Sequence, residues 1–231
     1  MFVAQSDQCS FDFGFGGVFS IRFKTSSPRS WSFSSLVSDM AITSLKNYVR
    51  YGDDDPDDLY HAMGKFTSTW EFLEVALAML YAEFIKQPNF SGYQQYGSAK
   101  IFKERLAVLC RAANSHFIAH PNQILEGEFD WLVSDITDLS VARNNIAHGV
   151  VATMPNPFID RGYVPKALAA PLWVLIPPFY ASGHFARQFV PAYIYNARRV
   201  YALRRVCLGR VEIVGNFRGK IRENGQKSPY D

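Results

Sequence analysis

The chain has 231 residues, of which 48% are hydrophobic, and its formal net charge is +3. That hydrophobic content supplies a substantial core and excludes a chain that is disordered throughout. The net charge is too small to indicate nucleic-acid binding by itself, so an electrostatic argument depends on where the charges lie. Five aspartates crowd residues 51–60, whereas residues 184–231 contain ten Lys or Arg against three acidic residues.

Cysteine usage and the apolar runs indicate a cytoplasmic protein without a membrane segment. Cys9, Cys110 and Cys207 lie far apart and form no CxxC pair, which argues against a disulfide framework or a structural zinc site. The N-terminal MFVAQSDQ lacks the basic and apolar regions of a secretory signal. The most apolar stretches, near 72–82 and 168–180, are interrupted by Glu or Pro and are shorter than a membrane span.

Residues 10–35 are rich in Ser, Gly and Phe, and the alternating VFSIRFK within them predicts a short hairpin or an ordered arm. Apolar residues at helical spacing then predict a first helix over 34–50. We assign residues 1–50 to this arm and helix. The aspartates that follow, over 53–58, indicate a solvated loop and helix start; nucleic-acid mimicry or a divalent-ion site is the alternative.

Three further helices are predicted between residues 57 and 147. Residues 57–86 are apolar around most of a helical surface, as in a central bundle member. After a loop over 87–98, a second helix is expected over about 98–114, with Ser98 as its N-terminal cap. A third helix is expected over about 126–147, where Gly149 marks the C-terminal stop.

The proline-rich segment 150–181 cannot form one helix, so we expect it to wrap the surface as a candidate lid, with a short strand over 172–176. A last long helix is predicted over 183–209, followed by a basic C-terminal extension over 211–231. The predicted fold is therefore all-α: an antiparallel helical bundle over 51–210, with an aromatic N-terminal arm and a proline-rich insertion before the last long helix.

The string RNNIAHG at the end of the 126–147 helix combines a permanent cation, Arg143, with a titratable imidazole, His148. Arginine offers a planar fork of donors to phosphate oxygens, and histidine exchanges a proton near neutral pH. Five helical steps turn about 140° beyond one full revolution, so a helix that continued past both would separate them. If the helix instead unwinds at Ala147, the imidazole can approach the guanidinium.

This string resembles the signature of the HEPN superfamily of helical bundles, in which four to six residues separate an Arg from a His and a polar residue follows the Arg. Here four residues separate Arg143 from His148, and Asn144 occupies the polar position. The resemblance also covers the order of elements over about 57–210. It does not cover the arm or the proline-rich segment.

The resemblance implies a metal-independent endoribonuclease in which the ribose 2′-hydroxyl attacks the adjacent phosphorus and leaves a cyclic phosphate. His148 would be the general base or acid, Arg143 would bind phosphate and stabilise developing charge, and Asn144 would orient the histidine or hold a phosphate oxygen. No metal or other cofactor is expected. The family usually pairs two motifs, which implies a homodimer with a composite site. RNA would be the substrate.

The role implied by the resemblance is phage defence, a toxin–antitoxin system or another stress response, with an antitoxin or regulatory protein as a candidate partner. Two alternatives stay open. Arg143 and His148 could be structural residues that satisfy the helix end. The domain could also be a catalytically silent module that binds RNA, a nucleotide or a protein.

Two pairs of residues outside the motif have candidate roles. Glu71 and Glu74, in the apolar central helix, either orient the motif as carboxylate partners of Arg143 or face solvent. His116 and His120 have the spacing of two metal ligands on a helix. The FIA between them lacks the Glu of HExxH, and no third ligand is close in sequence.

Four arginines of the last predicted helix are candidates for RNA binding: Arg198, Arg199, Arg204 and Arg205. Arginines can track a phosphate backbone, and the nearby Tyr193, Tyr195 and Tyr201 could stack on bases. The alternative is a solvated helix face with the tyrosines packed in the core. The sequence leaves both interpretations open.

Overall fold

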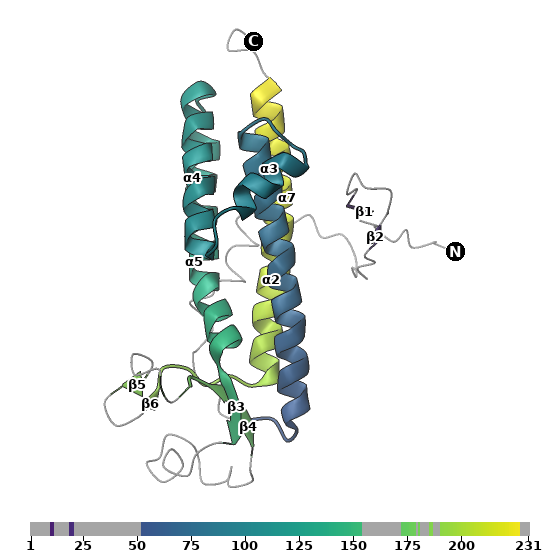
Figure 1. The fold of residues 1–231 in the computed structure, drawn as a ribbon, viewed down its shortest axis with the longest axis vertical. Coiled ribbons are helices and arrows are strands. Elements are labelled where there is room, and N and C mark those ends of the chain that lie inside the picture. The colour runs from purple at the N-terminus through teal and green to yellow at the C-terminus, as the bar shows by residue number, and fades with distance from the viewer. Residues whose placement is uncertain are drawn as a thin grey trace. The chain divides into compact units, whose positions relative to one another are not determined.

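The computed structural model describes residues 10–11, 19–20, 52–153, 172–178, 180, 185–186 and 190–226. This described part is mostly helical, as predicted (Figure 1). Its helices are α2 (Pro56–Phe84), α3 (Phe90–Gly97), α4 (Phe102–Ala119), α5 (Gln123–His148) and α7 (Ala197–Gln226). Its strands are β1 (Ser10–Phe11), β2 (Phe19–Ser20), β3 (Val150–Thr153), β4 (Trp173–Ile176), β5 (Phe185–Ala186) and β6 (Val190–Pro191). Within these residues, no helix is both long enough and apolar enough to cross a membrane.

The chain divides into an N-terminal unit, Met1–Ala41, and a second unit, Ile42–Asp231. In the N-terminal unit, β1 and β2 pair antiparallel. This pairing agrees with the hairpin alternative for residues 10–35. The helix expected over 34–50 lies outside the described residues.

The helix α2 is central to the second unit, as the apolar pattern over 57–86 predicts, and it contacts α3, α4, α5 and α7. Its start is set by Asp55, whose side chain accepts a hydrogen bond from the Asp57 N–H at 2.9 Å, and by Pro56 in the first turn. Asp57 and Asp58 place negative charge at the positive helix end. These aspartates are therefore the helix-start device that the sequence indicates.

The expected loop over 87–98 contains the helix α3. Asn89 caps this helix by accepting a hydrogen bond from the Gly92 N–H at 3.1 Å. A Cβ at position 92 would lie 2.2 Å from the Gln87 carbonyl oxygen, so the chain passes too closely for any residue but glycine. Residues typical of a turn thus form the cap and the close contact of a short helix.

The helix expected over 98–114 is α4, which begins and ends several residues later. Ser98 is not its N-terminal cap but the C-terminal cap of α3. The Ser98 hydroxyl donates to the Gln95 carbonyl at 2.7 Å, which satisfies an acceptor that the end of α3 leaves unpaired. Ile101 occupies the N-cap position of α4 and supplies no side-chain hydrogen bond.

The long helices do not simply alternate in direction, which corrects the expected antiparallel bundle. α2 and α7 run parallel. The Asp53 side chain, just before α2, is hydrogen-bonded to Ala197 at the start of α7, and Glu83 near the end of α2 is hydrogen-bonded to Arg222 near the end of α7. The contacts of α4 with α2 also run in the same order along both helices. Only α5 runs antiparallel to α2 and α7. The segment containing α3 carries the chain back along α2 before α4 begins; Figure 1 shows α2 and α7 side by side.

The predicted insertion over 150–181 contributes two strands at one end of the helices. β3 follows α5 directly and pairs antiparallel with β4, which corresponds to the strand expected over 172–176. The β4 backbone also exchanges hydrogen bonds with Asp53 and Tyr195. Its fully buried residues are Val174, Leu175 and Ile176. This strand is therefore part of the core and does not wrap the surface; residues 154–171 of the candidate lid lie outside the described residues.

The last helix, expected over 183–209, is displaced along the chain. α7 starts at Ala197, where the Asp53 side chain accepts a hydrogen bond from the Ala197 N–H at 2.7 Å. Burial raises the pKa of this Asp53 carboxyl. Residues 211–226, assigned to a basic extension, are the continuation of α7. Its start was misplaced because the apolar residues that precede it are buried in extended backbone rather than on a helix.

Candidate functional site

The helix α5 carries the motif in its last two turns. It begins after Asn122, whose side chain accepts a hydrogen bond from the Leu125 N–H at 3.1 Å, and it ends at His148. Of the two outcomes that the sequence left open, the helix continues to His148 and does not unwind at Ala147. Because His148 belongs to the helix, the Arg143 and His148 side chains leave α5 in directions about 140° apart.

Gly149 ends α5 for a reason other than a left-handed conformation. Its backbone is extended, with φ −72° and ψ 160°. A Cβ at this position would lie 2.7 Å from the Asn145 carbonyl oxygen and 2.7 Å from Cδ1 of Leu175. The strand β4 therefore approaches the end of α5 too closely for a residue with a side chain.

Arg143 is half-buried and packs on Trp70 of α2. The guanidinium carbon lies 5.9 Å from the indole ring centroid, within the range of a cation–π contact. Its Nη1 donates to the Asn144 side-chain oxygen at 3.2 Å. Among the described residues, no carboxylate pairs with this guanidinium and its other N–H groups have no hydrogen-bond partner.

Asn144 and His148 are exposed, and residues four apart on a helix lie on the same face. Asn144 contacts Arg143 on one side and lies one turn before His148. The amide thus connects the guanidinium to the face that carries the imidazole. The structure brings Arg143 and Asn144 together. It leaves His148 accessible one turn after Asn144, with its side chain directed about 140° away from that of Arg143.

Asn145 is the half-buried anchor of the motif, a role that the sequence did not reveal. Its side-chain amide donates to the Tyr195 hydroxyl at 3.2 Å, and its carbonyl accepts from the Tyr193 hydroxyl at 2.9 Å. The second contact satisfies one of the carbonyls that a helix end leaves unpaired. Burial and the neighbouring Tyr195 raise the pKa of Tyr193, so its hydroxyl stays a donor.

Glu74 is 8% exposed, and its buried carboxylate binds residues of α3 and α4. It accepts hydrogen bonds from Arg105 at 2.7 and 3.0 Å, from the Tyr96 hydroxyl at 3.1 Å and from the Trp70 indole at 3.2 Å. Burial, followed by the Glu74 charge, raises the pKa of Tyr96. Glu71 is exposed, as the solvent-facing alternative has it. Neither carboxylate contacts the motif arginine, but Trp70 lies between Glu74 and that arginine.

The four candidate RNA-binding arginines occupy different environments. Arg198 and Arg205 are exposed on α7. Arg204 is half-buried, and its Nε donates to the Thr69 hydroxyl at 3.1 Å. Arg199 is buried. Only Arg198 and Arg205 are therefore fully available to a phosphate backbone.

The three tyrosines expected to stack on bases are mostly inside the fold. Tyr193 and Tyr195 are buried, and the guanidinium of Arg199 lies 5.6 Å from the Tyr195 ring centroid. Tyr201 is half-buried, with the Lys65 ammonium 5.8 Å from its ring centroid. For Tyr193 and Tyr195, the core-packed alternative is the one observed.

His116 and His120 lie at the other end of the helices from the motif. His116 is 5% exposed, and neither of its ring nitrogens has a hydrogen-bond partner in the described part of the chain. Burial lowers the pKa of His116, with smaller effects from His120 and Lys86. His120 Nε2 lies 3.1 Å from the Lys86 ammonium. Among the described residues, no group of three His, Cys, Asp or Glu side chains is placed to hold a metal ion.

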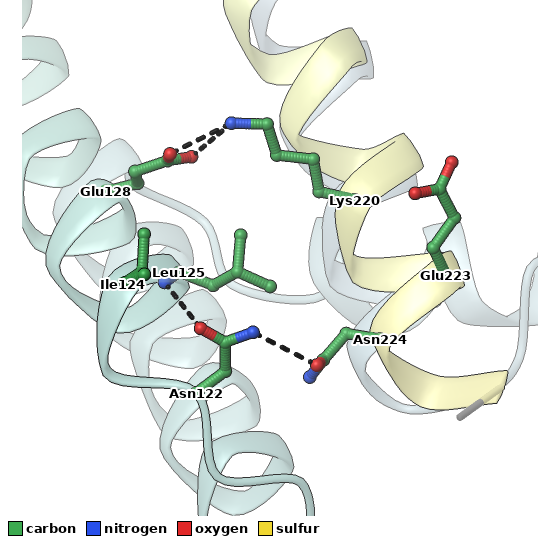
Figure 2. Close-up of a pocket in the computed structure, with 7 residues that line it drawn as sticks. All are labelled: Asn122, Ile124, Leu125, Glu128, Lys220, Glu223 and Asn224. Atoms are coloured by element: carbon green, nitrogen blue, oxygen red, sulfur yellow. Dashed lines mark hydrogen bonds and ion pairs between the residues drawn. The ribbon is translucent and has the colours of Figure 1, made fainter. Parts of the chain in front are cut away.

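A pocket of about 280 Å³ lies between the start of α5 and the end of α7 (Figure 2). Its lining residues are Asn122, Ile124, Leu125, Glu128, Lys220, Glu223 and Asn224. Figure 2 shows Lys220 paired with Glu128 and Asn122 paired with Asn224. The Lys220 ammonium lies 2.7 and 2.9 Å from the Glu128 carboxylate oxygens, and the Asn122 amide donates to the Asn224 side-chain oxygen at 3.2 Å. About 20 residues of α5, or roughly 30 Å, separate this pocket from the motif. The pocket and the motif are therefore distinct.

No protein-family model, curated protein or solved structure matches this chain. Its function is therefore inferred from the contacts of Arg143, Asn144 and His148.

Proposed function

We propose that this protein is a metal-independent endoribonuclease whose reacting groups are Arg143, Asn144 and His148. The observation that supports this proposal is the environment of the Arg143 guanidinium. Its guanidinium packs on Trp70, has no carboxylate partner among the described residues, and lies beside the exposed Asn144. An arginine with uncommitted donors can bind a phosphodiester, and the accessible imidazole of His148 can exchange the proton that cleavage must move.

The reaction is a transesterification within the RNA chain. The imidazole of His148 accepts the proton of a ribose 2′-hydroxyl, and the 2′-oxygen then bonds to the adjacent phosphorus. The bond from phosphorus to the 5′-oxygen breaks, which leaves a 2′,3′-cyclic phosphate on one product. A proton from a general acid completes the 5′-hydroxyl of the other. Arg143 stabilises the negative charge that develops on the phosphoryl oxygens.

A second copy of the chain would complete the site. One imidazole cannot accept the 2′-proton and donate the 5′-proton in the same step, so two His148 residues from a homodimer would share the roles. Arg198 and Arg205 would guide the RNA by contacting its phosphates. Such an enzyme would act in the cytoplasm, in phage defence, a toxin–antitoxin system or another stress response, with a regulatory protein to restrain it.

A second candidate function is a catalytically silent module that binds RNA, a nucleotide or a protein. The observation that favours it is the helical state of His148. Because α5 continues through His148, the imidazole and the guanidinium of one chain diverge by about 140°. In this case Arg143 would bind an anion and no bond would be cut.

One assay separates the two candidates. Purified protein is incubated with structured RNA in EDTA, and the wild type is compared with Arg143→Ala and His148→Ala. The exposed residues His61 and Arg111 provide matched controls, as His61→Ala and Arg111→Ala. For the nuclease we expect each motif variant to lose roughly 10²- to 10⁴-fold in rate, while folding and dimerisation persist and both controls stay active.

Other outcomes would overturn the nuclease. Cleavage that survives both motif substitutions, or that requires Mg²⁺, rules out the proposed chemistry. RNA binding without cleavage, lost in Arg143→Ala, supports the silent module. Mapping the ends of the products adds a chemical criterion, because the proposed reaction yields a cyclic phosphate and a 5′-hydroxyl.

A further inference from the structure

The carboxylate of Glu74 is the centre of a buried hydrogen-bond network between α2, α3 and α4. Arg105 binds both of its oxygens, at 2.7 and 3.0 Å, and the Tyr96 hydroxyl and the Trp70 indole N–H donate to it at 3.1 and 3.2 Å. The charge of the carboxylate is compensated by Arg105, and four donors satisfy its acceptor sites. A network satisfied in this way holds its members in one geometry.

Trp70 is the member of this network that touches the motif. It is 0% exposed, and its indole N–H is fixed on Glu74. The ring of Phe102 meets it edge-on at 5.0 Å and 71°. Contacts on its ring and on its N–H thus set the position and the tilt of the indole. The guanidinium of Arg143 lies 5.9 Å from that ring.

We infer that Trp70 is a positioning residue for Arg143: the indole, locked by Glu74, is the platform that holds the guanidinium beside Asn144. The inference rests on the proposed function, because it assigns the platform a purpose in the phosphate chemistry. An arginine side chain has many rotamers, and ordering it has an entropic cost. A fixed aromatic face orders the arginine side chain before RNA binds, so the binding step does not include that entropic cost. A cation–π contact uses the face of the guanidinium and leaves its N–H donors available.

The contacts form a continuous path from α4 to the motif. Arg105 binds Glu74, Glu74 binds Trp70, and Trp70 packs against Arg143. Trp70 contacts Arg143 but would contact neither the ribose nor the phosphate, so its removal should change how well Arg143 is aimed and not which groups react.

The first experiment measures cleavage kinetics in variants of the platform. Trp70→Leu removes the aromatic face, and Trp70→Phe restores an aromatic ring without the indole N–H. We expect Trp70→Leu to lower kcat about tenfold, because a misplaced catalytic group forfeits proximity, while KM changes less than about twofold. Trp70→Phe should recover most of the loss. The pH profile set by His148 should not move in either variant.

The chain contains a matched control, the pair of Arg210 and Trp131, whose guanidinium-to-ring distance is 5.5 Å. Trp131→Leu removes a similar ring from a similar contact far from the motif. We expect it to lower stability and to leave kcat unchanged. An equal loss of kcat in Trp131→Leu and Trp70→Leu, measured on folded protein, would show that Trp70 is only a core residue and would overturn the inference.

A second measurement does not depend on RNA cleavage. In the wild type, the indole ring current should shift the Nε–H resonance of Arg143, and that shift should disappear in Trp70→Leu and persist in Trp131→Leu. If the wild type cuts no RNA but the shift behaves as stated, the nuclease proposal fails and the platform stands. An Arg143 resonance that is the same in wild type, Trp70→Leu and Trp70→Phe would overturn the platform, whatever the protein does to RNA.

Discussion

Two arginines of this protein pack on tryptophan rings in opposite electrostatic settings. Arg210 is 1% exposed, lies 5.5 Å from the Trp131 ring and is paired with the carboxylate of Asp135. Arg143 lies 5.9 Å from the Trp70 ring and has no carboxylate partner in the described part of the chain.

The difference separates a structural arginine from one that can bind an external anion. A buried guanidinium that joins two helices needs a carboxylate to offset its lost hydration. A half-buried guanidinium at a helix end can remain partly hydrated, and an aromatic face holds it without neutralising its charge. Arg143 therefore keeps the charge and the donors that a phosphate would use.

The largest expected effect comes from breaking the structural pair. Asp135→Ala leaves Arg210 buried without its counter-charge, and we expect it to lower the free energy of unfolding by about 3–5 kcal/mol. Arg143→Ala should lower it by only about 1 kcal/mol, the scale of a cation–π contact. Urea titration of both variants measures the difference. Equal losses would contradict the distinction between the two arginines.

A smaller loss is expected where the strands support the motif end of α5. Gly149→Ala would place a Cβ 2.7 Å from both the Asn145 carbonyl oxygen and the Leu175 side chain. We expect about 1–3 kcal/mol of destabilisation from this overpacking. Gly127→Ala is the matched control, since a Cβ there meets nothing within 4 Å. Thermal unfolding checks both; an unchanged melting temperature in Gly149→Ala would mean that β4 does not press on the helix end.

Acid should destabilise the end of the bundle opposite the motif. Burial lowers the pKa of His116 in the folded chain, so the unfolded chain, with its histidine pKa near 6.5, binds a proton that the fold excludes. Stability is therefore complete above about pH 6.5 and falls as the pH decreases, by at most about 1.4 kcal/mol per pH unit for this group. The slope between pH 7 and 5 should become shallower in His116→Phe.

This pH test also separates a pH effect on stability from a pH effect on cleavage. His148 would govern the pH profile of cleavage, and His116 the pH dependence of stability. If His116→Phe leaves the stability slope unchanged, another group causes the acid sensitivity.

The smallest expected effect concerns the hydroxyl that binds the end of α5. Tyr193→Phe removes the 2.9 Å hydrogen bond to the Asn145 carbonyl and should lower the free energy of unfolding by about 1 kcal/mol. Amide hydrogen exchange should rise in the last turn of α5 more than in its first turn. Uniform exchange along α5 would argue that the tyrosine does not secure the motif.

Local patterns predicted much of the helical fold. The apolar pattern over 57–86 and the aspartates at its start located α2 to within a few residues, and the glycine that closes RNNIAHG located the end of α5. Errors arose where a residue has two uses. Asn89 suits a loop as well as a helix cap, and Ser98 can cap the start of one helix or the end of another. Only the packing of α3 on α2 decides between these uses.

The environment of the motif depended on contacts that no sequence window contains. Trp70 and Arg143 are far apart in the chain, and so are Asn145 and Tyr195. The directions of the helices bring them together, and the predicted antiparallel bundle did not include the parallel packing of α4 and α7 on α2. The sequence therefore led to the proposal of Arg143, Asn144 and His148 as a site, but it could not indicate the aromatic platform or the tyrosine anchor.

The account is tested most directly by titrating the protein with a short RNA while observing the arginine Nε–H resonances. We predict that the Arg143 resonance shifts and saturates as RNA is added, whereas that of Arg210, already paired with Asp135, stays in place. An Arg143 signal that does not respond, or arginine signals that all respond alike, would contradict the claim that the motif holds an uncommitted cation for phosphate.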